Sequence, residues 1–213
     1  MIRVLIVDDH AIVREGLANV LSSEPGISVV ATAASGPEAL QRIRDTQMDV
    51  VLLDLTMPGM NGMQTLKQIK IENNRLPVLI LSMHPEAQYA ARCIKAGAAG
   101  YLTKACEKKE LIAAVRCAAS GGTYLSPAAL DSLRKKIQPP GHVDTSHRRL
   151  SDREFEVFRQ IAEGVTLADM ARRMNLSPKT LSTYRTRILR KMELASNAEL
   201  MRYAFEQGLA KSP

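Results

Sequence analysis

The sequence is poor in cysteine and has no long hydrophobic run, and both absences narrow the classes of protein it can encode. Its three cysteines, Cys93, Cys106 and Cys117, are an odd number without metal-ligand spacing, which indicates reduced thiols rather than a disulfide framework. Apolar runs such as Val50 to Leu53 are far too short to span a bilayer. The apolar run at the N-terminus is equally brief and ends in two acidic residues, unlike a signal peptide. We therefore expect a cytoplasmic protein without a membrane segment.

Positive charge is unevenly distributed along the chain. The 213 residues have a formal net charge of +7, yet residues 1–121 contain 13 Lys and Arg against 12 Asp and Glu. Between Met170 and Met192 there is no acidic residue, and seven basic ones occur: Arg172, Arg173, Lys179, Arg185, Arg187, Arg190 and Lys191. A solvated helix face normally mixes both signs, so a cluster of one sign favours a polyanionic partner.

The first half of the chain alternates short apolar runs with helical patterns, as βαβ units do. The predicted strands are Arg3–Val7, Ser28–Thr32, Asp49–Leu53, Val78–Leu81 and Gly100–Leu102. Several are solidly apolar, as expected when helices cover both faces of a parallel sheet. Five β/α repeats in about 120 residues predict a doubly wound α/β domain.

A change of pattern after this half predicts a linker and a second domain. Gly121-Gly122 should end the fifth helix, and prolines follow. We interpret Pro139–His147 as a flexible linker and Ala128–Ile137 as a short helix within the connecting segment. The predicted domains are 1–121 and 148–213, joined by the linker 122–147.

The last part of the chain contains four helix-start signals. Two are full capping boxes, one is weaker, and one is an N-cap followed by proline. They are Ser151 with Glu154, Ser196 with Glu199, Thr166 with Asp169, and Ser177-Pro178. Four short helices predict a small all-α domain.

Polar residues follow the predicted strands of the first domain. Asp8 and Asp9 follow the first strand, Asp54 the third, Ser82 the fourth and Lys104 the fifth. Each alone is an ordinary cap or turn residue. Because the carboxyl ends of parallel strands meet at one edge, we expect all five side chains to gather there.

This set of groups has a definite chemistry. Three clustered carboxylates repel one another, and a hard divalent cation such as Mg²⁺ relieves this repulsion by binding their oxygens. A carboxylate can attack phosphorus to give an acyl phosphate, whose oxygens need counter-charge from the metal and from Lys104. Ser82 can donate a hydrogen bond to one of these oxygens.

The first half resembles the receiver domains of bacterial two-component systems over essentially residues 1–121. The matching residues are Asp8-Asp9, Asp54 within Asp-Leu-Thr-Met-Pro-Gly-Met-Asn-Gly, Ser82, Tyr101 and Lys104. The resemblance implies a flavodoxin-like, five-stranded parallel fold. One departure is Ala105, where many receivers have proline, which removes a rigid constraint but no chemistry.

The resemblance also implies a role for each residue. Asp54 would be the phosphoacceptor, with Lys104, Ser82 and Tyr101 completing the site, and Ser82 and Tyr101 changing position on phosphorylation. The implied Mg²⁺ ligands are Asp9, Asp54 and the carbonyl of Thr56, with Asp8 acting through water. Thr56 and His84 would flank the path of a hydrolytic water.

Two other classes fit the first half less well. A phosphohydrolase of the haloacid dehalogenase type needs a second Asp two residues after the nucleophile, where this chain has Thr56. A nucleotide-binding fold needs a glycine-rich loop after the first strand, where the chain reads Asp9-His10-Ala11-Ile12.

In the second half, a basic helix at Ser177–Met192 follows a short helix at Leu167–Met174, the order of a helix-turn-helix. This half of the chain resembles the LuxR-type output domain of NarL/FixJ response regulators, nearest the GacA/UvrY group. The matching segments are Leu150-Ser-Asp-Arg-Glu, Ile161-Ala-Glu-Gly, Leu176-Ser-Pro-Lys-Thr and Lys191-Met. The resemblance implies that Ser182, Thr183 and Thr186 face the major groove and that Lys179, Tyr184, Arg185 and Arg187 contact phosphates. The last helix, Ser196–Glu206, would form the dimer contact.

Two further alternatives concern the whole chain. A quorum-sensing LuxR protein needs an aromatic-rich acyl-lactone domain, but this chain has no Trp and only 4% aromatic residues. A signalling module whose helical domain binds proteins instead of DNA stays open. We predict a transcription factor rather than an enzyme, with Mg²⁺ as cofactor. Its expected partners are double-stranded DNA, a sensor histidine kinase, a second copy after phosphorylation, and RNA polymerase.

Overall fold

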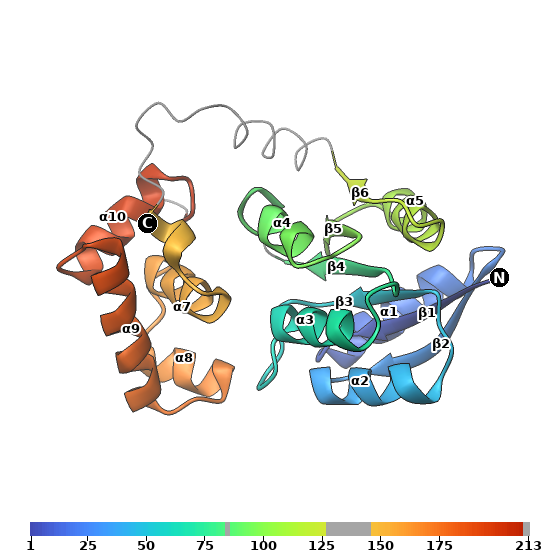
Figure 1. The fold of residues 1–213 in the computed structure, drawn as a ribbon, viewed down its shortest axis with the longest axis horizontal. Helices are drawn as coiled ribbons and strands as arrows, with labels where there is room; N and C mark the ends of the chain where they lie inside the picture. Colours follow the sequence, from blue (N-terminus) through green and yellow to red (C-terminus); the bar gives the residue numbers. More distant parts are fainter. Residues whose placement is uncertain (84–85, 127–145, 211–213) are drawn as a thin grey trace. The chain divides into compact units, whose positions relative to one another are not determined.

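The computed structural model describes residues 1–83, 86–126 and 146–210, which form two compact units, Met1–Pro139 and Pro140–Pro213 (Figure 1). Three sequence predictions lie outside the described residues: the position of His84, the short helix Ala128–Ile137 and most of the linker Pro139–His147. Within the described ranges, no helix is both long and apolar enough to cross a membrane.

A parallel sheet forms the centre of the first unit. Its strands are β1 Ile2–Val7, β2 Ile27–Ala33, β3 Val50–Leu53, β4 Val78–Ser82, β5 Gly100–Thr103 and the short β6 Tyr124–Leu125, in the order β2-β1-β3-β4-β5-β6. All five predicted strands are confirmed to within one residue at each end. Strands β3 and β4 are buried along their whole length, in agreement with their unbroken apolar runs.

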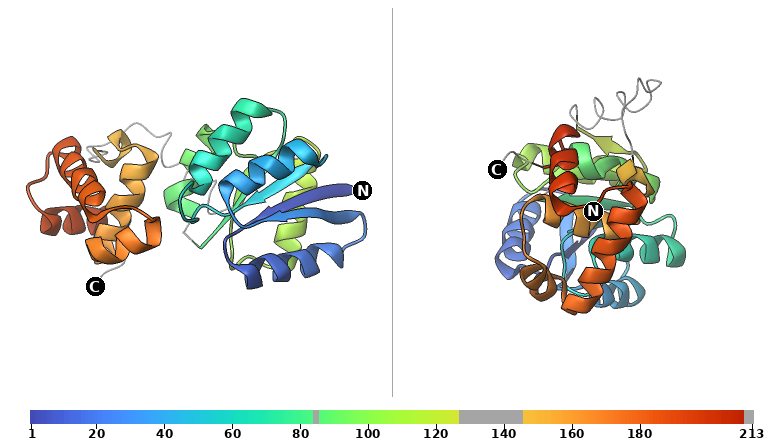
Figure 2. Two further views of the ribbon diagram at one scale, coloured as in Figure 1. Left: turned by 90° about the horizontal axis from the view of Figure 1, so that it is seen from below. Right: turned by 90° about the vertical axis from the view of Figure 1, so that its left-hand side faces the viewer.

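Helices cover both faces of this sheet (Figure 2). Helices α1 Ala11–Ser22 and α5 Lys108–Ala119 lie on one face, where Leu21, Leu111 and Val115 pack with residues of β1, β3, β4 and β5 in one core cluster. Helices α2 Gly36–Asp45 and α3 Gly62–Glu72 pack together on the other face, and α4 Glu86–Lys95 packs beside β5. This arrangement is the doubly wound α/β fold that the alternating sequence pattern predicts.

The sixth strand is a feature that the sequence pattern did not predict. Tyr124 and Leu125 pair with Gly100 and Tyr101, and the Tyr124 N–H donates to the Ala99 carbonyl at 2.8 Å. Gly100 allows this close approach, since a Cβ there would lie 2.6 Å from the Tyr124 carbonyl oxygen. A strand of two residues has no alternation to detect. The sheet therefore extends beyond residue 121.

The part of the second unit that the structure describes, residues 146–210, is helical. It contains the 3₁₀ helix η1 Ser146–Arg149 and four α-helices, α7 Asp152–Ala162, α8 Leu167–Met174, α9 Pro178–Met192 and α10 Asn197–Glu206. Each predicted N-cap is confirmed, because Ser151, Thr166, Ser177 and Ser196 all accept a backbone N–H of the first turn. One detail was wrong: Glu199 accepts from the Ala195 N–H, one residue too early for the capping box predicted with Ser196.

Glu193 ends the basic helix α9 in a conformation that favours glycine. Its φ of 58° and ψ of 39° lie in the left-handed region, where a Cβ is unfavourable. Its ion pair with Arg149 is exposed on both sides and contributes little. We expect Glu193→Gly to raise the free energy of unfolding of the 146–213 fragment by about 1 kcal/mol in urea denaturation. Glu163→Gly is the control, because Glu163 also ends a helix but at a φ of −83°, so no gain is expected there.

Candidate functional site

Backbone hydrogen bonds between neighbouring strand ends bring the predicted site residues together. The Asp54 N–H donates to the Val7 carbonyl at 2.9 Å, which places the end of β3 against the end of β1. The Lys104 N–H donates to the Ser82 carbonyl at 2.8 Å, which does the same for β5 and β4. The carboxyl ends of these strands therefore form a single edge, as in other open parallel sheets with a site.

An ammonium group bridges two buried carboxylates at this edge. The Lys104 Nζ lies 2.6 Å from the Asp8 Oδ2 and 2.9 Å from the Asp54 Oδ2. Asp8 and Asp54 are 1% and 3% exposed, whereas the side chain of Asp9 is 24% exposed. With three carboxylates against one ammonium, the ionised cluster has a net charge of −2, which one divalent cation balances.

Burial and pairing shift the protonation of this cluster. Burial raises the pKa of Asp54, while its hydrogen bond and ion pair with Lys104 oppose the rise only in part. Burial alone would lower the pKa of Lys104, but the hydrogen bonds to Asp8 and Asp54 outweigh it, and the net shift is upward. Lys104 therefore stays charged, ready to pair with an anion at Asp54.

The cluster offers ligand atoms suited to a metal ion. Asp8, Asp9, His10 and Asp54 each contribute one such atom, all within 4.8 Å of one another. The Asp54 Oδ1 is buried and has no hydrogen-bond partner among the described residues. An unsatisfied buried carboxylate oxygen is costly unless a cation or a covalent partner completes it. The donor set therefore fits a metal ion, and His10 is a member that the sequence analysis missed.

The loop after Asp54 is held by a tight backbone approach. A Cβ on Gly62 would lie 2.0 Å from the Asp54 carbonyl oxygen and 2.6 Å from the Leu55 Cα, so only glycine fits. The Gly62 N–H donates to the Leu55 carbonyl at 3.0 Å. Asn61 and Gln64 form a reciprocal capping box at the start of α3, which the sequence analysis also missed. These contacts fix the position of Asp54 from its C-terminal side.

Of the other predicted residues, Ser82 and Thr56 follow the strands to this edge, whereas Tyr101 lies further back in the sheet. Ser82 is fully buried at the end of β4, and Tyr101 is fully buried in β5 opposite Ile80. Thr56 is exposed in the loop after Asp54.

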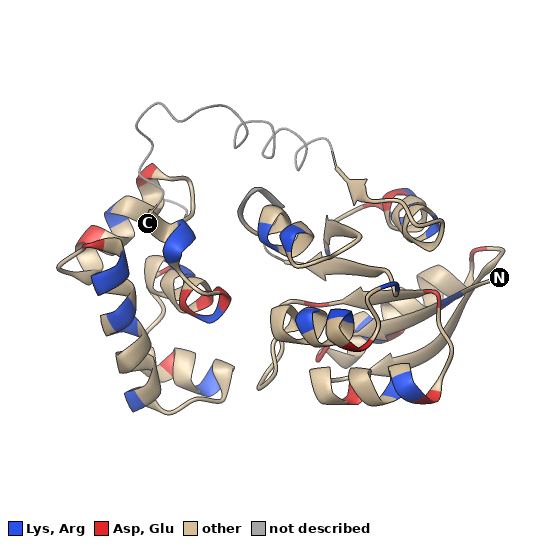
Figure 3. Ribbon diagram, viewed as in Figure 1, with Lys and Arg blue, Asp and Glu red and all other residues tan. Residues whose placement is uncertain are grey.

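In the second unit, most of the residues predicted to contact DNA are exposed on α9. Lys179, Ser182, Thr183, Thr186 and Arg187 are exposed, and basic residues follow one another along the helix (Figure 3). The hydroxyls of Thr183 and Thr186 donate to the carbonyls of Lys179 and Ser182, each at 3.1 Å. In this arrangement both threonines offer an acceptor oxygen and a methyl group, rather than a donor, to a partner.

Two basic residues of α9 are engaged with neighbouring helices instead. The Arg185 Nε donates to the Asn197 Oδ1 at 2.7 Å, which ties α9 to the start of α10. The Lys191 Nζ lies 2.6 Å from the Oε2 of Glu154 in α7. Burial would raise the pKa of Glu154, but its bonds to Lys191 and Ser151 lower it overall. These contacts fix two basic side chains of α9 against α7 and α10, while Lys179 and Arg187 remain exposed.

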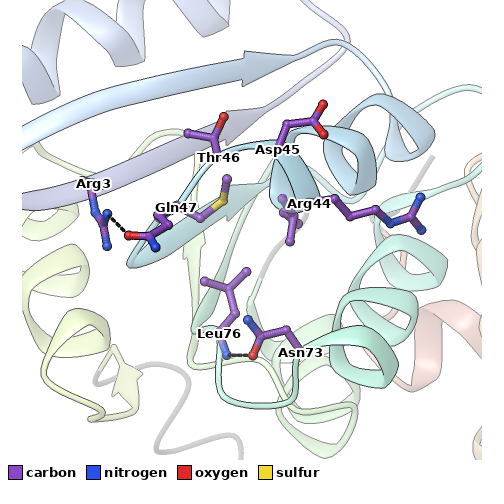
Figure 4. Close-up of a pocket in the computed structure, with 9 residues that line it drawn as sticks. Arg3, Arg44, Asp45, Thr46, Gln47, Asn73 and Leu76 are labelled. Carbon is purple, nitrogen blue, oxygen red and sulfur yellow. Dashed lines mark hydrogen bonds between the residues drawn. The ribbon is translucent and has the colours of Figure 1, made fainter.

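A pocket of about 350 Å³ lies at the opposite edge of the sheet, among residues before β3 and β4 and after α2 and α3 (Figure 4). Its charged groups are already paired: Arg3 with Asp49 and Gln47, and Arg44 with Glu72. Nothing in its lining gathers reactive groups, so we assign no function to it.

Known proteins match both units. The chain matches the response regulator receiver domain family over residues 4–116 and the bacterial regulatory proteins of the luxR family over residues 148–204. It is 33% identical to the response regulator UvrY of Escherichia coli K12, with 100% of this chain and 97% of UvrY aligned. It is 36% identical to the response regulator GacA of Pseudomonas protegens, with 98% of each aligned.

A solved structure aligns with nearly the whole chain. RcsB from Salmonella enterica serovar Typhimurium, solved bound to a promoter with the phosphomimetic BeF3⁻, is 27% identical with a TM-score of 0.65, covering 95% of this chain and 97% of that one. The predicted resemblance to the GacA/UvrY group and the classification as a transcription factor rather than an enzyme are confirmed. The chain belongs to the two-component response regulators that carry a LuxR-type DNA-binding domain.

Proposed function

We propose that Asp54 is the phosphoacceptor and that a Mg²⁺ ion binds beside it. Asp9, Asp54 and the Thr56 carbonyl would be direct ligands, and Asp8 would act through water. The observation that carries this proposal is the buried Asp54 Oδ1, which has no hydrogen-bond partner among the described residues while Oδ2 contacts Lys104. One oxygen of Asp54 is thus available to a cation or to phosphorus.

The phosphotransfer step follows from these positions. A carboxylate oxygen of Asp54 forms a bond to phosphorus as the bond from phosphorus to the imidazole nitrogen of the kinase breaks, and that nitrogen then takes up a proton. A cation held by Asp9, Asp54 and the Thr56 carbonyl would supply counter-charge to the phosphoryl oxygens. Lys104, freed from Asp54, pairs with one of these oxygens, and Ser82 donates a hydrogen bond to another.

Phosphorylation would then change the state of the receiver. Ser82 moves toward the phosphoryl group, and Tyr101 shifts with it, which biases an existing equilibrium between two receiver conformations. His84, with Thr56, would set the lifetime of the phosphorylated form. We place the protein in the cytoplasm, where a sensor kinase presents its phosphohistidine.

The output domain would bind double-stranded DNA through α9. Ser182, Thr183 and Thr186 would face the bases of the major groove, while Lys179, Tyr184, Arg185 and Arg187 would contact phosphates. Arg185 has N–H groups beyond the Nε that bonds Asn197. Met201 and Phe205, one turn apart and 38% and 54% exposed, give α10 an apolar face suited to a two-fold dimer contact. RNA polymerase would be the further partner at promoters.

The test of this function is the dependence of DNA affinity on phosphorylation. We expect the fragment 146–213 to bind DNA without phosphorylation, and the phosphorylated full-length chain to bind at least ~10-fold more tightly than the unphosphorylated one, about 1.4 kcal/mol of coupling. Both forms are titrated at fixed salt against DNA selected from a random library by the fragment.

Arg187→Ala should weaken binding and its salt dependence, whereas Arg116→Ala, a matched change on α5, should not. Equal affinities for the phosphorylated and unphosphorylated forms would remove phosphorylation as the control. If Arg187→Ala left the DNA affinity as unchanged as Arg116→Ala does, the basic residues of α9 would not serve DNA binding. That outcome would favour a protein-binding role for the helical domain.

A further inference from the structure

His10 lies directly against the acidic cluster, although it is not needed to build the fold. Its Nδ1 lies 2.9 Å from the Asp9 Oδ1 and 3.3 Å from the Asp8 Oδ1, and its backbone N–H donates to the Asp8 Oδ1 at 2.9 Å. The side chain is 65% exposed, so packing does not explain its place. As the N-cap of α1 it makes no side-chain capping bond, where Ser, Thr, Asp or Asn would.

The spacing of the cluster is that of ligands around one ion. Two ligand atoms of a single transition metal lie at most about 4.2 Å apart, twice a bond length of about 2.1 Å. The ligand atoms of Asp8, Asp9, His10 and Asp54 are all within 4.8 Å of one another, so small rotations of the more exposed His10 and Asp9 side chains suffice. The buried Asp54 Oδ1, without a hydrogen-bond partner among the described residues, is the second sign that a cation completes this site.

The types of donor atom decide which cations benefit from His10. Mg²⁺ selects oxygen ligands and keeps several waters, so an imidazole adds little to its binding. First-row transition metals bind imidazole nitrogen more strongly, and carboxylates beside it suit Mn²⁺ and Zn²⁺. An imidazole among three carboxylates therefore discriminates between these two classes of metal.

We propose that His10 is a nitrogen ligand of the acidic site, and that it shifts the preference of this site from Mg²⁺ towards divalent first-row transition metals. This inference rests on the proposed metal site at Asp9 and Asp54, but it does not depend on phosphotransfer. The site then responds to two kinds of cation through one set of carboxylates, and His10 sets the preference between them.

The experiment measures binding of Mn²⁺ and of Mg²⁺ to the full-length chain, together with pulsed electron paramagnetic resonance of bound Mn²⁺. We expect modulation from a coordinated ¹⁴N in the wild type and its loss in His10→Ser, a change that supplies a favoured N-cap and so preserves the helix. His10→Ser should weaken Mn²⁺ binding at least ~10-fold, since loss of even an outer-shell partner commonly costs that much. Mg²⁺ affinity should change less than about 2-fold.

Two control variants separate the possible failures. His147→Phe removes a histidine of the second unit while keeping an aromatic ring beside Phe155, and it should leave the ¹⁴N signal intact. Asp9→Asn should weaken both metals. Absence of ¹⁴N modulation in the wild type, its loss in His147→Phe, or equal effects of His10→Ser on both metals would overturn the role of His10 while leaving the Mg²⁺ site standing. Unchanged Mg²⁺ binding in Asp9→Asn would contradict the proposed site itself.

Discussion

Asp54→Asn is expected to abolish formation of the acyl phosphate when the protein is incubated with acetyl phosphate and Mg²⁺. Asp54 alone among the described acidic residues combines burial at the end of a central strand with a contact to Lys104 and a free carboxylate oxygen. An amide is not nucleophilic enough to replace the carboxylate. Intact-mass measurement before and after incubation shows the phosphate adduct directly. Asp9→Ala should also lose labelling, because it removes a metal ligand.

The control is Asp45→Asn, an exposed acidic residue at the end of α2 that accepts only from Gln41. It should label as the wild type does.

Unfolding will not explain a loss of labelling in Asp54→Asn. Because the pKa of Asp54 is raised in the folded state, its ionisation lowers the free energy of unfolding as pH rises from about 3.8 through the folded pKa, and the whole penalty applies above that pKa. The uncharged Asn should therefore melt no lower than Asp54. An adduct of equal yield on the variant would move the phosphoacceptor elsewhere.

Gly62→Ala should destabilise the first unit by at least about 3 kcal/mol, the upper range for overpacking of a core. The added methyl would lie 2.0 Å from the Asp54 carbonyl oxygen and 2.6 Å from the Leu55 Cα. Both are backbone atoms of the phosphoacceptor loop, so no side-chain rotation relieves the contact. Either α3 moves away or the loop does, and in both cases Asp54 loses its position against Lys104.

Gly16→Ala is the matched control for this substitution. Gly16 lies inside α1, and a Cβ there meets nothing within 4 Å. Alanine is favoured over glycine in a helix interior by roughly 0.5–1 kcal/mol, so this variant should be more stable than the wild type. In urea denaturation, the changes in the free energy of unfolding relative to the wild type should have opposite signs for the two variants. A Gly62→Ala protein that unfolds and labels as the wild type does would show that the loop is not held by this contact.

The central strands β3 and β4 were predictable because each is an unbroken run of apolar residues, as expected for strands that are buried on both faces. The carboxylate edge was predictable for a topological reason, since parallel strands deliver their carboxyl ends to one side. The N-caps were predictable from single residues, because Ser151 or Ser177 satisfies a backbone donor through local chemistry alone.

What the sequence did not reveal depends on distance in space. The bond from Arg185 to Asn197 links two helices across a loop, whereas the resemblance to the LuxR-type domain implied only a phosphate contact for that arginine. The approach of His10 to Asp8 and Asp9 depends on a backbone turn that places the imidazole beside both carboxylates. The capping box of Asn61 and Gln64 did have a signal in the sequence, namely an Asn followed three residues later by a Gln.

The two residues of β6 determine where the first unit can be divided from the rest of the chain. A fragment that ends at 121 would expose the N–H and C=O groups of β5 as an open edge, and such edges pair with other molecules. It would also lose the Tyr124 hydroxyl, which donates to Glu110 in α5 at 3.4 Å. A fragment that ends at 126 keeps both the pairing and this contact, and should therefore remain monomeric at concentrations where the shorter one associates.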